Sequence, residues 1–228
     1  MIIVFPKQIV RYLFTIAVVL DGLSFLVQLP RYALGYALPQ KIVDFFNIGG
    51  EYNPQAWYSS LLLVLCSLLL LLIAAEERRL FSNTTGYWYG LSFVFFYLAS
   101  DEMLLLHERA SELLSPHIHA VGIFRYAWVV IAIPICLILG VVFLKFLLNL
   151  PQRIRTLFFV SAGLYLGGAL ILEMIEGAVA SLYGEGSIFD FLLVAIEEFL
   201  EKLGTILFIY ALLTHIRLSI KSIQIEIR

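Results

Sequence analysis

The sequence has few charged residues. They make up 14% of its 228 residues, against about 25% in soluble domains. Hydrophobic residues make up 61%, and the mean hydropathy of +0.95 excludes both an ordinary cytosolic globule and a disordered chain. The two cysteines are too few for a disulfide scaffold, and the net charge of −2 excludes a basic nucleic-acid binder. The class that remains is an all-α, multi-pass membrane protein.

Common catalytic motifs are also missing. The sequence contains no Gly-x-Ser-x-Gly, no His-Glu-x-x-His, no phosphate-binding loop and no dinucleotide fingerprint. Motifs therefore leave open whether the protein is an enzyme. The evidence has to come from the places where the few charged residues lie.

Apolar runs of about 20 residues predict a bundle of six transmembrane helices in a single domain, residues 1–228. The expected spans are about 9–29, 57–75, 86–106, 124–148, 154–182 and 188–216. Pro39, between the first two spans, precedes apolar residues that favour an interfacial helix on the outer side. Residues 217–228 are expected to form a cytoplasmic tail.

Basic residues indicate the orientation of the spans. Ten Lys and Arg residues lie at one set of span ends and four at the other. Cytoplasmic loops are enriched in Lys and Arg. We therefore expect a protein of the cell (inner) membrane with both termini in the cytoplasm and with loops 30–56, 107–123 and 182–187 outside.

Acidic residues show the opposite bias, since 13 of the 17 fall in the outer half. With a helix rise of about 1.5 Å per residue, acids of the third, fifth and sixth spans lie at one depth, roughly 8 Å above the membrane centre. Asp21 of the first span lies slightly lower. An ionised carboxylate at this depth costs about 2.5–3.5 kcal/mol, so these acids need protons, basic partners or metal ions. Nearby bases are few (Lys202, Arg125 and Arg109), and Lys202 is four residues from Glu198, which favours an ion pair.

Carboxylates with a nearby histidine on facing helices are how di-iron and di-manganese centres are built. The leading hypothesis is therefore a divalent metal site for Fe, Zn or Mn that opens to the outer side. Its expected ligands are Asp101, Glu102, His107, Glu108, Glu173, Glu176, Glu197, Glu198 and Glu201. A metalloenzyme that acts on a lipid or another apolar small molecule would suit such a site.

Two other functions remain open. Intramembrane acids mark proton or cation pathways, so the protein could be a proton- or cation-coupled transporter. Its size also suits a structural accessory subunit of a membrane complex, with acids that join helices. The expected partners are the lipid bilayer and an apolar small-molecule substrate, without nucleic acid, while protein partners or a homo-oligomer remain compatible with the sequence.

Three motifs resemble a group of uncharacterised bacterial multi-pass membrane proteins. They are Glu51-x-Asn53-x3-Trp57-Tyr58-Ser59, Ser100-Asp101-Glu102-x4-His107-Glu108 and Glu197-Glu198-x2-Glu201-x2-Gly204. The resemblance runs from about residue 45 onward and carries no known activity. It implies that the three motifs act together, and it adds Glu51 and Asn53 to the outer cluster.

Overall fold

Helices make up nearly all of the computed structural model, which describes residues 5–35, 38–118, 120–184 and 186–219. These ranges contain no strand. The longer helices are α1 (Pro6–Leu34), α3 (Pro54–Arg79), α4 (Thr85–Leu104), α6 (Val129–Leu148), α7 (Gln152–Leu166), α8 (Glu173–Tyr183) and α9 (Ile188–Ser219). The shorter segments are α2 (Gln40–Phe46), α5 (Leu106–Leu114), the 3-10 turn η1 (Gly122–Phe124) and the π-helix η2 (Gly167–Leu172).

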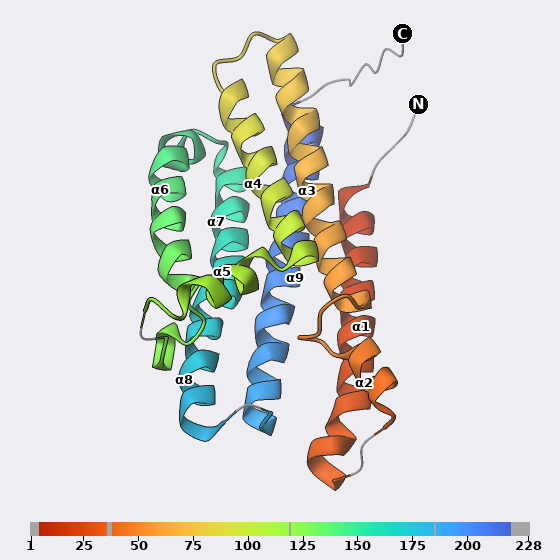
Figure 1. Ribbon diagram of the computed structural model, residues 1–228. Coiled ribbons are helices and arrows are strands. Elements are labelled where there is room, and N and C mark those ends of the chain that lie inside the picture. Colours follow the sequence, from red (N-terminus) through yellow and green to blue (C-terminus); the bar gives the residue numbers. More distant parts are fainter. Residues whose placement is uncertain (1–4, 36–37, 119, 185, 220–228) are drawn as a thin grey trace.

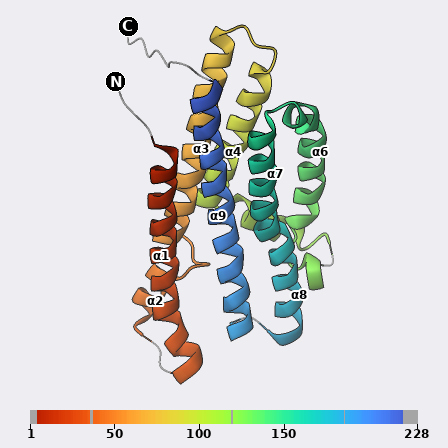
Figure 2. The ribbon, with the colours of Figure 1, turned by 180° about the vertical axis from the view of Figure 1, so that it is seen from behind.

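The long helices lie side by side in one bundle (Figures 1 and 2). α7, η2 and α8 form one continuous helical passage, and α9 lies against α1, α3, α7 and α8. The beginning of α1 and the end of α9 lie toward the same end of the bundle as the α3–α4 and α6–α7 turns (Figure 1). This arrangement agrees with an even number of passages through the bundle.

Local sequence explains where several helices begin and end. Asn53 caps α3 because its side-chain oxygen accepts hydrogen bonds from the backbone N–H groups of Gln55 and Ala56, and Pro54 occupies the first helical position. α1 ends at Gly35, whose left-handed φ of 63° suits glycine. α2 lies where the sequence predicts an interfacial helix on the outer side. α9 continues to Ser219, so most of the predicted tail lies outside the described residues.

Four helical segments are long and apolar enough to cross a membrane: Pro6–Tyr32, Pro54–Arg79, Val129–Leu148 and Gln152–Leu182. α4 and α5 meet the same criterion together, but they are bent by 73°. The described chain thus offers four or five apolar crossings and not clearly the predicted six. The sixth expected span, α9, has 32 residues and is not one of these crossings.

The predicted third span, about 86–106, corresponds to α4 (Thr85–Leu104), and the chain bends sharply after it. α4 stops at Leu104, and Leu105 takes the left-handed conformation with a φ of 54°. Asp101 and Glu108 therefore lie on two different helices, α4 and α5. The fourth span begins later than expected, at Val129, because residues 122–128 form η1 and an irregular connection.

The interior of the bundle has an apolar part and a polar part. Toward the end with the α3–α4 and α6–α7 turns, Trp88 packs against Phe146 and Phe158, and Ile209 and Leu212 are fully buried. The carboxylates lie further along the bundle, around the end of α4, the start of α8 and the middle of α9 (Figure 1). The site therefore borders a dry apolar core on one side.

Candidate functional site: a buried carboxylate network

Lys202 of α9 is almost completely buried, with 1% of its surface exposed. Its Nζ lies 3.1 Å from Oε2 of Glu198, which confirms the pair expected from their spacing, and 3.2 Å from Oδ1 of Asp21 on α1. An ammonium group without water requires such partners, because burying an isolated charge costs several kcal/mol. The Asp21 contact joins the first helix of the chain to the last one.

Glu173 and Glu176 lie at the start of α8, and both accept hydrogen bonds from the segment before α6. Trp128 Nε1 donates to Oε1 of Glu173 over 2.7 Å, and the Tyr126 hydroxyl donates to Oε1 of Glu176 over 2.8 Å. Burial and the neighbouring charge of Glu176 raise the pKa of Tyr126, which keeps this hydroxyl a donor. The sequence reasoning missed both aromatic donors, although Tyr126 and Trp128 are the polar-tipped aromatics expected near a membrane boundary.

The carboxyl groups of Glu176 and Glu197 lie close enough to interact directly, which connects α8 to α9. A hydrogen bond between two carboxyl groups requires one proton, since an ionised carboxylate is only an acceptor. Glu51 and Glu108 make a second contact of this type between the loop before α3 and the helix α5. Two ionised carboxylates this close repel each other, so each contact favours a shared proton.

Asp101 determines the break between α4 and α5. Its Oδ1 accepts the backbone N–H of His107 over 2.8 Å, and its Oδ2 contacts Nδ1 of the same histidine over 2.9 Å. The carboxylate thereby satisfies a free N–H group in the first turn of α5. His107 also packs its ring against Trp128, with ring centroids 5.3 Å apart. Asp101 and His107, both predicted metal ligands, are therefore hydrogen-bonded to each other.

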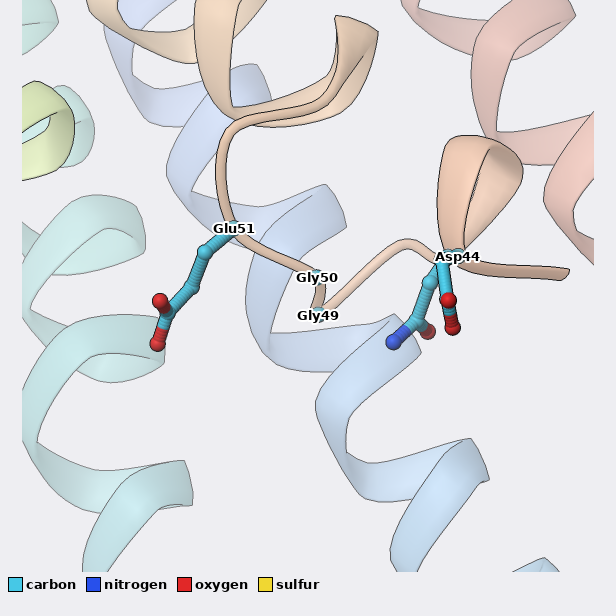
Figure 3. A pocket seen from close by; sticks show the side chains of 5 residues that line it. Asp44, Gly49, Gly50 and Glu51 are labelled. Atoms are coloured by element: carbon cyan, nitrogen blue, oxygen red, sulfur yellow. The ribbon is translucent and has the colours of Figure 1, made fainter. Parts of the chain in front are cut away.

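The loop between α2 and α3 supplies the remaining candidates. Asn53 Nδ2 donates to the backbone oxygens of Asp44 and Asn47, so this residue organises the loop. The loop borders an open hollow of about 330 Å³ lined by Asp44, Asn47, Gly49, Gly50 and Glu51. Figure 3 shows Asp44 and Glu51 at the two ends of the segment that lines this hollow, with the side chain of Glu51 directed away from Asp44. Glu51 interacts with Glu108 of α5, and Asn53 stabilises the loop through its hydrogen bonds.

Two glycines bring the α7–α8 passage very close to α9. A Cβ on Gly168 of η2 would lie 2.8 Å from the backbone oxygen of Glu197, and a Cβ on Gly204 would lie 2.9 Å from the backbone oxygen of Ser161. The π-helix is located at this approach. A π-helix inside an α-helix is rare and is frequent at functional sites. Its position next to Glu197 and Glu201 makes it part of the candidate site.

The structure thus brings most of the predicted residues into one connected region. Glu201 lies within electrostatic range of Glu102, Glu173 and Glu198, which belong to α4, α8 and α9. Glu108 and His107 lie at the α5 edge of this region. However, within the described residues no group of three or more His, Cys, Asp or Glu side chains is arranged to hold a metal ion. Metal binding by these residues stays a prediction that the geometry does not support.

The chain matches a protein-family model described as a domain of unknown function (DUF8692) over residues 11–216. Comparison with curated proteins gave no significant match, and comparison with solved structures gave none either. The expected resemblance to an uncharacterised family is therefore confirmed at the level of the family. Because the match covers nearly the whole chain, the protein belongs to this family, the domain of unknown function DUF8692.

Proposed function

We propose that this protein crosses the cell (inner) membrane six times, with both termini in the cytoplasm, and that its buried carboxylate network binds protons in proton- or cation-coupled transport. Support for six crossings comes from α9. With a rise of about 1.5 Å per residue, a helix of this length reaches beyond a hydrocarbon core of about 30 Å. The one basic residue in its middle, Lys202, is buried between helices and paired, and Glu197, Glu198 and Glu201 are half-buried.

One observation carries the transport proposal: beside the carboxylates, one helix is broken and another changes from α-helix to π-helix. α4 stops at Leu105, next to Asp101 and Glu102, and the π-helix η2 lies against Glu197 and Glu201. Interrupted helices at membrane depth are tolerated only where they are buried in protein or line a cavity. Secondary transporters place their substrate and coupling-ion sites at such interruptions.

The excess of buried carboxylates over basic partners supports the same proposal. Lys202 neutralises one charge among Asp21, Glu198 and their neighbours, whereas the close contact of Glu176 and Glu197 favours a shared proton. Glu173 and Glu176 receive their other hydrogen bonds from neutral side chains. A network that already stores protons in apolar surroundings can release and rebind them when its surroundings change.

The apolar part of the bundle closes the path from the carboxylates to the end with the α3–α4 turn. Ile206, Ile209 and Leu212 follow the charged part of α9 and are at most 1% exposed. These three side chains cannot carry a proton, so we expect transport to require a second conformation in which this region opens. The close packing of η2 on α9 is the contact that we expect to change.

The test is proton flux into liposomes that contain the purified protein. Glu201→Gln removes a carboxylate from the middle of the network, whereas Glu112→Gln removes an exposed carboxylate of α5 and serves as the matched control. We expect flux in the wild type and in Glu112→Gln, and at least a tenfold loss in Glu201→Gln. Equal flux in the wild type and in Glu201→Gln would refute the proposal.

A further inference from the structure

Four side chains of α1 and α3 have buried polar atoms without a hydrogen-bond partner among the described residues. These atoms are Asp21 Oδ2, Ser24 Oγ, Gln55 Oε1 and Ser59 Oγ. The residues are 6%, 0%, 1% and 8% exposed, so bulk water does not reach them. Each unmade hydrogen bond in an apolar interior is costly, so the four atoms together require a partner.

The four residues face one seam, where α1, α3 and α9 meet. Asp21 and Ser24 are three residues apart on α1 and therefore share a helix face, and Asp21 contacts Lys202 of α9. Gln55 lies against the same part of α1, because its Nε2 donates to the backbone oxygen of Leu20 over 2.8 Å.

Ser59 lies one turn after Gln55 on α3 and faces the same seam. Cys66, two turns further along this face, contacts the backbone oxygen of Thr205 on α9. Thr205 is three residues after Lys202. Because α3 and α9 run in the same direction (Figure 1), Ser59 lies level with a position about two turns before Thr205, near Glu198, the partner of Lys202.

The chemistry of the four atoms selects the partner. All of them are oxygens, and the carboxylate and amide oxygens are acceptors only, so the partner must donate hydrogen bonds or carry positive charge. Hard cations prefer such a set of carboxylate, amide and hydroxyl oxygens. The seam contributes one carboxylate beside the Lys202 ammonium, which is too little negative charge for a divalent ion.

We propose that Asp21, Ser24, Gln55 and Ser59 form a binding site for a sodium ion. The inference rests on the proposed transport function and names its coupling ion. Lys202 Nζ and a sodium ion both require the Asp21 carboxylate, and two positive charges at that distance repel each other. Sodium binding therefore expels a proton: sodium and the Asp21–Lys202 ion pair become sodium-bound Asp21, neutral Lys202 and a released proton.

Other ionisable groups around Lys202 bear on where that proton leaves. Glu198 pairs with Lys202 directly, and Glu102 of α4 and Glu201 of α9 lie within electrostatic range of it. Tyr58 of α3 lies near Asp21, and its hydroxyl donates to the backbone oxygen of Leu13. The carboxylates of Glu198, Glu102 and Glu201 lie where they can relay the expelled proton to the solvent, so that it leaves the protein.

The test compares sodium chloride with choline chloride at equal ionic strength on the purified full-length protein in detergent. We expect sodium to raise the melting temperature of the wild type and to release protons, which a pH-indicator dye detects in weak buffer. Ser59→Ala and Asp21→Asn should each weaken the apparent sodium affinity at least tenfold. Asp190→Asn, which changes an acid at the start of α9 outside the seam, should bind sodium like the wild type.

Lys202→Met separates sodium binding from proton release. This variant should still be stabilised by sodium but should release no protons. Equal melting temperatures of the wild type in sodium and choline would mean that water fills the seam, which overturns the proposal. Proton flux into liposomes without any sodium effect would likewise refute the sodium site and leave the proposed transport intact, whereas sodium binding without flux would refute the transport alone.

Discussion

Gly168 of η2 lies so close to Glu201 of α9 that a Cβ at this glycine would be 2.9 Å from Cγ of the glutamate. The π-helix and the most central carboxylate are therefore in direct contact. A change in the winding of η2 moves the backbone past Glu201, and a change in the charge of Glu201 alters the surface on which η2 packs. This contact couples the protonation of the network to the shape of the α7–α8 passage.

Replacement of Gly168 by alanine tests this packing. The added methyl group would meet the backbone oxygen of Glu197 at 2.8 Å, and backbone atoms of two packed helices cannot move apart cheaply. We expect Gly168→Ala to lower the free energy of unfolding by about 1–3 kcal/mol. Gly163→Ala is the control, since a Cβ there meets nothing within 4 Å and alanine favours helix. Equal melting temperatures for the two variants would contradict the close contact.

The buried ion pair of Lys202 predicts a strong effect of single substitutions. Lys202→Met leaves Asp21 and Glu198 without their cation, and removal of one partner of a buried pair costs about 3–5 kcal/mol. Adding Asp21→Asn should restore part of the lost stability, because the second change removes an uncompensated charge. Lys145→Met on the exposed surface of α6 should change the melting temperature little. A double variant less stable than Lys202→Met would argue against the pair.

Metal analysis of the protein purified in mild detergent tests the hypothesis drawn from the sequence. The structure predicts no stoichiometric Fe, Zn or Mn, because Asp101 and His107 bind each other and Glu173 and Glu176 accept hydrogen bonds from Trp128 and Tyr126. Bound metal at one ion or more per chain, lost in Glu173→Gln, would restore the metal site and count against a proton network.

The proposed orientation predicts opposite labelling of the two ends of the bundle. In a chain with Cys66→Ala and Cys136→Ala, a cysteine at Ser82 in the α3–α4 turn should react with an impermeant thiol reagent only after the cells are opened. A cysteine at Ser115, after α5, should react in intact cells. The reverse pattern would place the termini outside, and labelling of both positions in intact cells would contradict a fixed six-pass topology.

Much of the fold follows from the sequence because hydropathy and basic residues respond to the membrane itself. The Leu-rich run of α3 and the apolar α6 are evident without a structure, and Glu198 and Lys202 pair as their spacing predicts. The break at Leu105 was not predictable in this way, since neither glycine nor proline interrupts residues 91–115. It depends on Asp101, which satisfies the first turn of α5 through space.

The candidate site was predictable as a set of residues but not as a set of contacts. Depth along each helix placed the acids in one layer, whereas their partners come from elsewhere in the chain: Trp128 is 45 residues from Glu173, and Tyr126 is 50 residues from Glu176. The paired glycines Gly167 and Gly168 were the sequence signal for the π-helix. Contacts between residues so far apart in the sequence decide whether carboxylates face a metal, a base or one another. A single sequence does not determine such contacts.

The measurement that tests the proton network most directly is the infrared absorption of protonated carboxyl groups at neutral pH. Because the close contact of Glu176 and Glu197 favours a shared proton, we expect the wild type to show a protonated carboxyl band that decreases in Glu197→Gln and not in Glu112→Gln. A wild-type spectrum with ionised carboxylates alone would contradict the network and, with it, the proposed transport of protons.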